Sequence, residues 1–278
     1  MKGSIAADVA THPEFRRCGI YKALSESSWK DAVRNQIPIS FGDASKALIS
    51  TARRYGILDV STIAIMIKPL NPHRIVEKRF GKGFFAKTVS GGVESTLKLL
   101  SIAKKKARIT GLKARRIVVF DDRIDVFWKR ISPFYGICLV RNKEYLNWKY
   151  LERPHLRFDA FLVEAGERVL GYVVLSTTVE GGLKKGLIVD MMTHPARKDA
   201  IYYLFSQAVD HFKRIGVDYV ECWTLRNSPC YKLLGSHGFF APGLLVRSNL
   251  VARFDSSKVS EEFIKDSRNW YITLGDFQ

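Results

Sequence analysis

The residues with the clearest chemical potential belong to a short frame that the chain contains twice. Asp-x-x-Thr-His-Pro occurs at residues 8–13 and again at residues 190–195, each time just before a helical pattern. Where a strand passes through a tight turn into a helix, unpaired backbone N–H groups and the helix dipole together form an anion site. The sequence therefore predicts a duplicated unit whose turns are suited to phosphate.

The turn after the first frame carries all the residue types that such a site needs. Arg16 and Arg17 supply positive charge, and Gly19 lets the backbone approach a ligand where a side chain would stand in the way. Cys18 lies in the same basic turn, but no histidine and aspartate accompany it in a pattern that would make it a nucleophile. We expect the first turn to bind an anion.

The turn after the second frame departs from this pattern. Residues 196–201 contain no glycine, and Asp199 puts a carboxylate where a phosphate would lie, which disfavours binding through like-charge repulsion. Arg197 and Lys198 offset that repulsion in part. The second copy is therefore expected to be structural or to contact an acceptor substrate.

These motifs resemble those of the GCN5-related N-acetyltransferase superfamily. The first turn is similar to its acyl-coenzyme A motif, Gln/Arg-x-x-Gly-x-Gly/Ala: Arg16 and Gly19 match, whereas Tyr21 occupies the last small position. Downstream, Asn227, Gly238 and Phe239 fit the superfamily's later helix pattern. Leu234 stands where that pattern has its acid-donating tyrosine, and the first copy has Leu48 and Ala52 in this region, again without a tyrosine.

The resemblance implies a set of site residues in the first copy. The pantetheine arm of acetyl-coenzyme A, or of another acyl-coenzyme A, would pair with the end of the first strand, and its pyrophosphate would lie on the following turn. Asp8 is the candidate general base, either directly or through a water molecule, with a purely structural carboxylate as the alternative. The implied cofactor-binding residues are Val9, Ala10, Thr11, Arg16, Arg17, Cys18, Gly19, Ile20 and Tyr21.

The order of strand and helix patterns predicts a mixed α/β (α+β) fold, in which sheets flanked by helices form two acetyltransferase-like modules. Residues 1–70 read strand-helix-strand-helix-strand, the C-terminal half of such a module; either the reading frame starts upstream or another segment completes its sheet. Residues 71–113 are expected to form a basic helical linker, with helices over Arg74–Lys87 and Val93–Arg108. Residues 114–255 contain the order of a complete module, and residues 256–278 form a C-terminal extension.

Charge and cysteine content narrow the class of protein. The formal net charge is +18, and basic residues are densest between Lys104 and Arg116. This favours a solvated face of the linker, with nucleic acid, an acidic lipid surface or a polyanionic substrate as the alternative partners. The four scattered cysteines have neither zinc-ligand spacing nor the density of a disulfide scaffold, which predicts no metal and a reducing cytoplasm. No apolar run approaches the ~20 residues of a membrane-spanning helix.

The expected activity is transfer of an acyl group from acyl-coenzyme A to an amine acceptor. Two alternatives remain. One is a non-catalytic module that uses its basic surface to bind nucleic acid or acidic membrane. The other is aminoacyl transfer from a charged transfer RNA, as in enzymes that build cell-wall peptides with paired modules of this fold.

Overall fold

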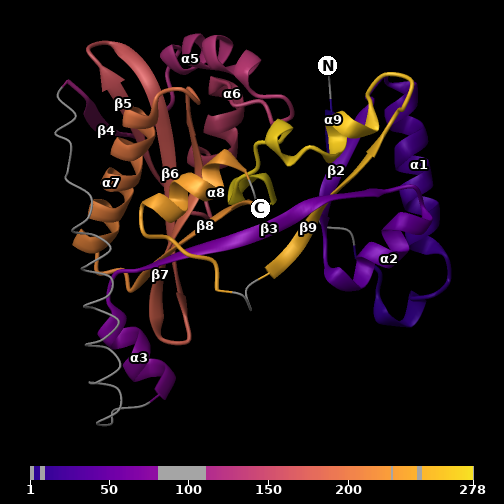
Figure 1. Cartoon of the computed structure of the whole chain (residues 1–278), viewed down its shortest axis with the longest axis horizontal. Coiled ribbons are helices and arrows are strands. Elements are labelled where there is room, and N and C mark those ends of the chain that lie inside the picture. Colours follow the sequence, from indigo (N-terminus) through magenta and orange to yellow (C-terminus); the bar gives the residue numbers. More distant parts are fainter. Residues whose placement is uncertain (1–2, 7–9, 81–110, 227, 243–245, 278) are drawn as a thin grey trace.

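The two repeated segments fold into the same succession of elements in the computed structural model, which describes residues 3–6, 10–80, 111–226, 228–242 and 246–277. Each consists of strand, helix, strand, helix and strand (Figure 1). The first comprises β1 (Gly3–Ala6), α1 (Ile20–Arg34), β2 (Ile39–Ala44), α2 (Lys46–Arg54) and β3 (Leu58–Pro69). The second comprises β7 (Leu183–Thr193), α7 (Lys198–Arg214), β8 (Tyr219–Leu225), α8 (Pro229–Ser236) and β9 (Val246–Phe254).

The strands of both segments join one sheet of nine strands, in the order β1-β2-β9-β3-β8-β7-β6-β5-β4. The last strands are exchanged: β9 pairs with β2 of the first segment, and β3 pairs with β8 of the second, both antiparallel. β3 and β9 also pair with each other in the middle of the sheet, where Figure 1 shows them between the two halves. The mixed α/β fold is thus confirmed, and neither segment closes its part of the sheet alone.

The region between the two segments supplies the other edge of the sheet. Its strands β4, β5 and β6 form an antiparallel meander that continues from β7. Residues 81–110, most of the predicted helical linker, lie outside the described residues, and the predicted domain boundaries remain a prediction. The elements of this region are α3 (Pro72–Phe80), β4 (Lys113–Ile117), α5 (Arg123–Ile131), α6 (Lys143–Leu146), the π-helical turn η3 (Asn147–Leu151), β5 (Asp159–Ala165) and β6 (Arg168–Glu180).

Two buried clusters cover the two faces of the sheet. Along β6, Tyr172 and Val174 belong to one cluster and Val173 to the other, as expected because successive strand residues point to opposite faces. α5, α6 and η3 fill the first cluster, and α7 and α8 fill the second. In contrast, α1 buries only Ala32 of its 15 residues.

The C-terminal residues, which the sequence predicts to be an extension, contribute to the first cluster. They form α9 (Glu261–Lys265), η4 (Ser267–Asn269) and η5 (Leu274–Phe277). Trp270 is 4% exposed, and its ring packs edge-on against Phe41 of β2 with centroids 5.3 Å apart. Leu274 at the far end of this segment is buried in the same cluster. The segment therefore connects the two halves of the molecule across one face of the sheet.

Candidate functional site

Both strand–helix–strand segments begin with a short parallel pair of strands. β1 and β2 pair over Gly3–Ala6 and Ile39–Gly42. β7 and β8 pair over Lys185–Ile188 and Tyr219–Cys222, although β7 continues to Thr193. In both cases the strand that comes first in the chain leads into a turn and then into the helix that crosses to the second strand.

Two residues of the first turn have left-handed backbone angles. After the 3₁₀ turn η1 (Pro13–Phe15), Arg17 has φ 68° and Gly19 has φ 78°, both in the left-handed region. Gly19 is the N-cap of α1, and a Cβ added to it would meet nothing within 4 Å. The space beside Gly19 is open, and successive backbone N–H groups in turns with left-handed residues can form an anion-binding concavity.

The side chains of the first turn leave its positive charge available. Arg16 donates from Nε to the carbonyl of Thr11 at 3.4 Å, which ties the predicted pantetheine strand to the predicted phosphate turn. Among the residues that the structure describes, neither Arg16 nor Arg17 pairs with a carboxylate. Cys18 is exposed, with Sγ 3.7 Å from the carbonyl of Arg16.

The remaining predicted site residues differ in their exposure. Ala10 is exposed before η1, and Ile20 is exposed at the start of α1. The ring of Tyr21 is half-buried beside Tyr55, with centroids 6.1 Å apart, and burial followed by the neighbouring phenol raises the pKa of Tyr21. Asp8 and Val9 lie outside the described residues.

The second turn is neutralised by its own side chains. Arg197, the N-cap of α7, donates from Nε and Nη2 to the two carboxylate oxygens of Asp199 at 2.8 and 2.6 Å. These bonds lower the pKa of Asp199. His194 accepts a hydrogen bond on Nδ1 from the backbone of Ala196 at 3.1 Å, the role expected of a residue that organises the turn. The guanidinium that an anion would need is therefore already committed to a carboxylate.

Beyond its pairing with β8, β7 is contacted by the C-terminal segment. η5 lies against both β7 and β8. The hydroxyl of Tyr271 donates to the carbonyl of Met191, and Tyr135 donates to the carbonyl of Thr193 at 2.5 Å. A β-carbon at Gly275 would lie 3.2 Å from the carbonyl oxygen of Val189, the bulged residue of β7. The protein's own chain thus occupies the place where these two strands separate.

A buried ionic cluster holds this segment in place. Arg141 is fully buried and donates from Nε to both oxygens of Asp190 at 3.2 Å, and from Nη2 to Asp276 at 2.8 and 3.0 Å. The hydroxyls of Tyr150 and Tyr172 donate to Asp190 Oδ2 at 3.1 and 3.0 Å. Burial raises the pKa of Asp276, against the opposing effect of Arg141.

This cluster defines the role of the aspartate in the second frame. Asp190 corresponds to Asp8, the predicted base of the first frame, yet here it is a buried and fully hydrogen-bonded anchor. Sequence reasoning missed its partners Arg141 and Asp276, which are 135 positions apart. The apolar and aromatic run around Trp270 was the one sequence signal that the C-terminal residues are buried.

In α8, the residue at the tyrosine position of the superfamily's later helix pattern is part of the core. Leu234 on α8 is completely buried in the second cluster, so it packs where the superfamily pattern has its acid-donating tyrosine. Asn227 lies outside the described residues. Within the described part of the chain, no group of three His, Cys, Asp or Glu side chains is placed to hold a metal ion, and no helix is both long and apolar enough to cross a membrane.

No protein-family model and no curated protein sequence matches the chain. Solved structures do match it in fold. A GCN5-related N-acetyltransferase from Anabaena variabilis superposes with a TM-score of 0.58 at 14% identity, over 88% of this chain and 53% of that one. A conserved protein of unknown function from Enterococcus faecalis, described as a probable N-acyltransferase, gives 0.57 at 14% identity, over 88% and 53%.

The same fold match extends to a second group of acyltransferases. The N-myristoyltransferase of Saccharomyces cerevisiae, solved with bound myristoyl-CoA, superposes with a TM-score of 0.55 at 16% identity, over 89% of this chain and 58% of that one. The chain thus spans little more than half the length of the structures that it matches. With its mixed sheet and flanking helices, it has the fold of the GCN5-related N-acyltransferases.

Proposed function

We propose that this chain is an acyl-coenzyme A-dependent N-acyltransferase whose cofactor site is the first repeat. The observation that carries the proposal is the first turn, where left-handed Gly19 opens the N-terminus of α1 beside two arginines without a carboxylate partner in the described structure. A diphosphate is recognised by several convergent N–H donors and a nearby guanidinium. The yeast myristoyltransferase with bound myristoyl-CoA supports an acyl-coenzyme A as the ligand.

The helix start offers the required donors. The first backbone hydrogen bond into α1 runs from the N–H of Ala23 to the carbonyl of Gly19. The N–H groups of Ile20, Tyr21 and Lys22 therefore precede the helical ladder, as at every helix N-terminus. We assign the diphosphate to these groups with Arg16 and Arg17, and the pantetheine arm to the backbone of Val9, Ala10 and Thr11.

The chemistry then follows from the bonds exchanged. The amine nitrogen of the acceptor attacks the thioester carbonyl, the carbon–sulfur bond breaks, and the thiolate of coenzyme A leaves. The acceptor nitrogen must lose a proton, and we propose Asp8 as the group that takes it, directly or through water. No tyrosine stands at the usual acid position in either repeat, so we assign protonation of the leaving thiolate to solvent.

The second repeat is proposed to support the acceptor side. Its turn is neutralised by the Arg197–Asp199 pair, and its strand separation is occupied by the C-terminal segment.

All four cysteines are free thiols, which supports a place in the cytoplasm.

Acetyl-coenzyme A binding tests the proposal, with Cys18 as a reporter. Cys18 is exposed in the first turn, whereas Cys222 is buried and burial raises the pKa of Cys230 to about 11. A thiol reagent at pH 8 should therefore modify Cys18 first. Bound coenzyme A should slow that modification and give micromolar affinity in calorimetry, with peptide mapping to locate the label.

Two results would contradict the assignment. Absence of binding at millimolar acetyl-coenzyme A would leave the non-catalytic and transfer-RNA-dependent alternatives. Binding without protection of Cys18 would place the cofactor elsewhere in the molecule.

A further inference from the structure

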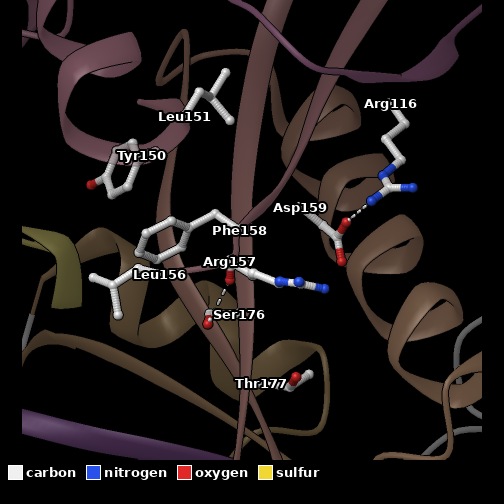
Figure 2. Close-up of a pocket in the computed structure, with 9 residues that line it drawn as sticks. All are labelled: Arg116, Tyr150, Leu151, Leu156, Arg157, Phe158, Asp159, Ser176 and Thr177. Atoms are coloured by element: carbon white, nitrogen blue, oxygen red, sulfur yellow. Dashed lines mark hydrogen bonds and ion pairs between the residues drawn. The ribbon is translucent and has the colours of Figure 1, made fainter. Parts of the chain in front are cut away.

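A hollow of about 480 Å³ lies on the β4–β5–β6 side of the sheet, away from the first turn (Figure 2). Its lining comes from β4, η3, the loop before β5, and the first residues of β5 with their neighbours on β6. We call it the β5–β6 hollow. Its volume lies within the ~300–1,000 Å³ of typical small-molecule sites.

One wall of the β5–β6 hollow is apolar. It is formed by Leu151, Leu156 and Phe158, and Leu156 is 46% exposed although it is a large aliphatic side chain. The ring of Phe158 is held edge-on by Tyr150, with centroids 5.3 Å apart. Tyr150 is itself fixed through its hydroxyl to buried Asp190. This wall is therefore preformed and offers apolar surface to a ligand.

The opposite side carries a positive charge without a partner. Figure 2 shows the Arg157 side chain extending away from Leu156 and Phe158, between Asp159 and Thr177. Ser176 donates a hydrogen bond to the backbone carbonyl of Arg157 at 3.2 Å, which fixes the base of that side chain. Within the described residues, the guanidinium of Arg157 has no ion pair.

The one acid of the hollow is already engaged. The carboxylate of Asp159 pairs with the guanidinium of Arg116, and its Oδ2 lies 3.1 Å from Nε2 of His211. Asp159 therefore already has two partners, and with Arg116 and Arg157 the hollow keeps a net positive charge. A cation is disfavoured there, and an anion gains a planar guanidinium donor.

We propose that the β5–β6 hollow binds a small organic anion, with its carboxylate or phosphate on Arg157 and its apolar body against Leu156 and Phe158. The inference does not depend on the proposed acyl transfer, because it uses none of the residues of the first turn. It adds a second ligand site on the other half of the molecule.

Ligand-observed NMR and calorimetry on the full chain test it with four probes: 3-phenylpropionate, phenyl phosphate, neutral 3-phenylpropionamide and inorganic phosphate. The two organic anions should bind, and the amide should bind about tenfold or more weakly, since it lacks the charge-assisted bond. Arg157→Gln should weaken both organic anions by a similar factor. Arg168→Gln, at the opposite end of β6, is the matched control and should leave binding unchanged.

A second variant tests the contribution of the apolar wall to binding separately from that of Arg157. Leu156→Asn should weaken 3-phenylpropionate and leave the interaction of inorganic phosphate as in the parent. A preference for phenyl phosphate over 3-phenylpropionate would identify the anion as a phosphate ester, and the reverse would identify a carboxylate. The proposal is overturned if no organic anion binds at millimolar concentration, if the amide binds as well as the acid, or if Arg157→Gln binds as the parent does.

Discussion

The two repeats share their order of elements but use their strand–helix turns in opposite ways. In the first, Gly19 leaves open space, and the described structure gives Arg16 and Arg17 no acid. In the second, Arg197 is closed onto Asp199. The C-terminal segment also lies where β7 and β8 separate. The first turn is thus accessible, whereas the second repeat is held by the Arg197–Asp199 ion pair and by contacts with the C-terminal segment.

The two segments also differ in how much of each is buried. The exchange of β3 and β9 makes each half depend on the other for its central strand. The buried contacts of the C-terminal segment with β7 and β8 lie in the second segment. The helix α1 buries one residue only, whereas α7 buries six. The predictions below test this contrast.

The largest effect is expected for Gly19→Val. A valine at φ 78° is strained, and its branched side chain would stand in the open space beside the helix start. We expect coenzyme A affinity to fall by about a thousandfold or more, equivalent to ~4 kcal/mol, measured by calorimetry.

Gly166→Val provides a matched control for this variant. Gly166 also has a left-handed φ, 59°, with nothing within 4 Å, but it lies in the hairpin between β5 and β6. Both variants should lose a similar amount of stability, about 1–3 kcal/mol. If Gly166→Val reduced coenzyme A binding as much as Gly19→Val, the loss would reflect strain and not the site.

The second prediction removes the buried arginine that holds the C-terminal segment against the second repeat. Arg141→Met leaves Asp190 and Asp276 buried without their cation, and removing one partner of a buried ion pair costs about 3–5 kcal/mol. Urea unfolding of the variant should show this loss. Adding Asp190→Asn and Asp276→Asn should recover part of it, because no buried carboxylate then lacks a partner.

Coenzyme A binding by the Arg141→Met variant tests whether the second repeat takes part in the cofactor site. Under conditions where Arg141→Met remains folded, its affinity for coenzyme A should equal that of the parent. A loss of affinity in the folded variant would show that the second repeat takes part in cofactor binding.

The sequence predicted local elements well because their signals are local. The Gly19 turn marks the start of α1, and the apolar run ending at Pro69 forms β3. The helical pattern after Pro195 became α7, which starts at Lys198. In each case hydrophobic period and a turn residue lie within the same short stretch.

The pairing of distant segments was beyond such signals. β9 pairs with β2 across more than two hundred positions, and nothing in either strand's sequence encodes that partner. Likewise Arg141 looks like any surface arginine until Asp190 and Asp276 surround it. The candidate turn could be found from its residues, whereas the contacts that set the two turns apart arise from tertiary packing.

A smaller effect is expected for Arg16→Ala. A hydrogen bond to a charged group contributes about 1.5–3 kcal/mol, so coenzyme A affinity should fall by roughly 10- to 150-fold. Arg34→Ala, at the other end of α1 and paired with Asp31, should leave affinity unchanged. Equal losses in the two variants would indicate a general effect of net charge, which calorimetry at two salt concentrations would reveal.

The smallest effect is expected for Asp199→Asn in the second turn. Its coenzyme A affinity should stay within about twofold of the parent, because the C-terminal segment still contacts both β7 and β8. Stability should fall by less than about 1 kcal/mol at pH 7, since the side chains of Arg197 and Asp199 are 41% and 39% exposed.

The pH dependence of that loss identifies its cause. The hydrogen bonds from Arg197 lower the pKa of Asp199 in the folded protein, so the ionised carboxylate stabilises the fold above its unfolded pKa of about 3.9. The contribution disappears as the pH falls through the lowered, folded value. Urea unfolding of parent and variant should therefore differ at pH 7, and the difference should shrink steadily as the pH is lowered below about 3.9. A difference that did not shrink on acidification would assign the loss to the side-chain amide itself, and a gain in coenzyme A affinity at pH 7 would show that Asp199 alone had kept the second turn from binding.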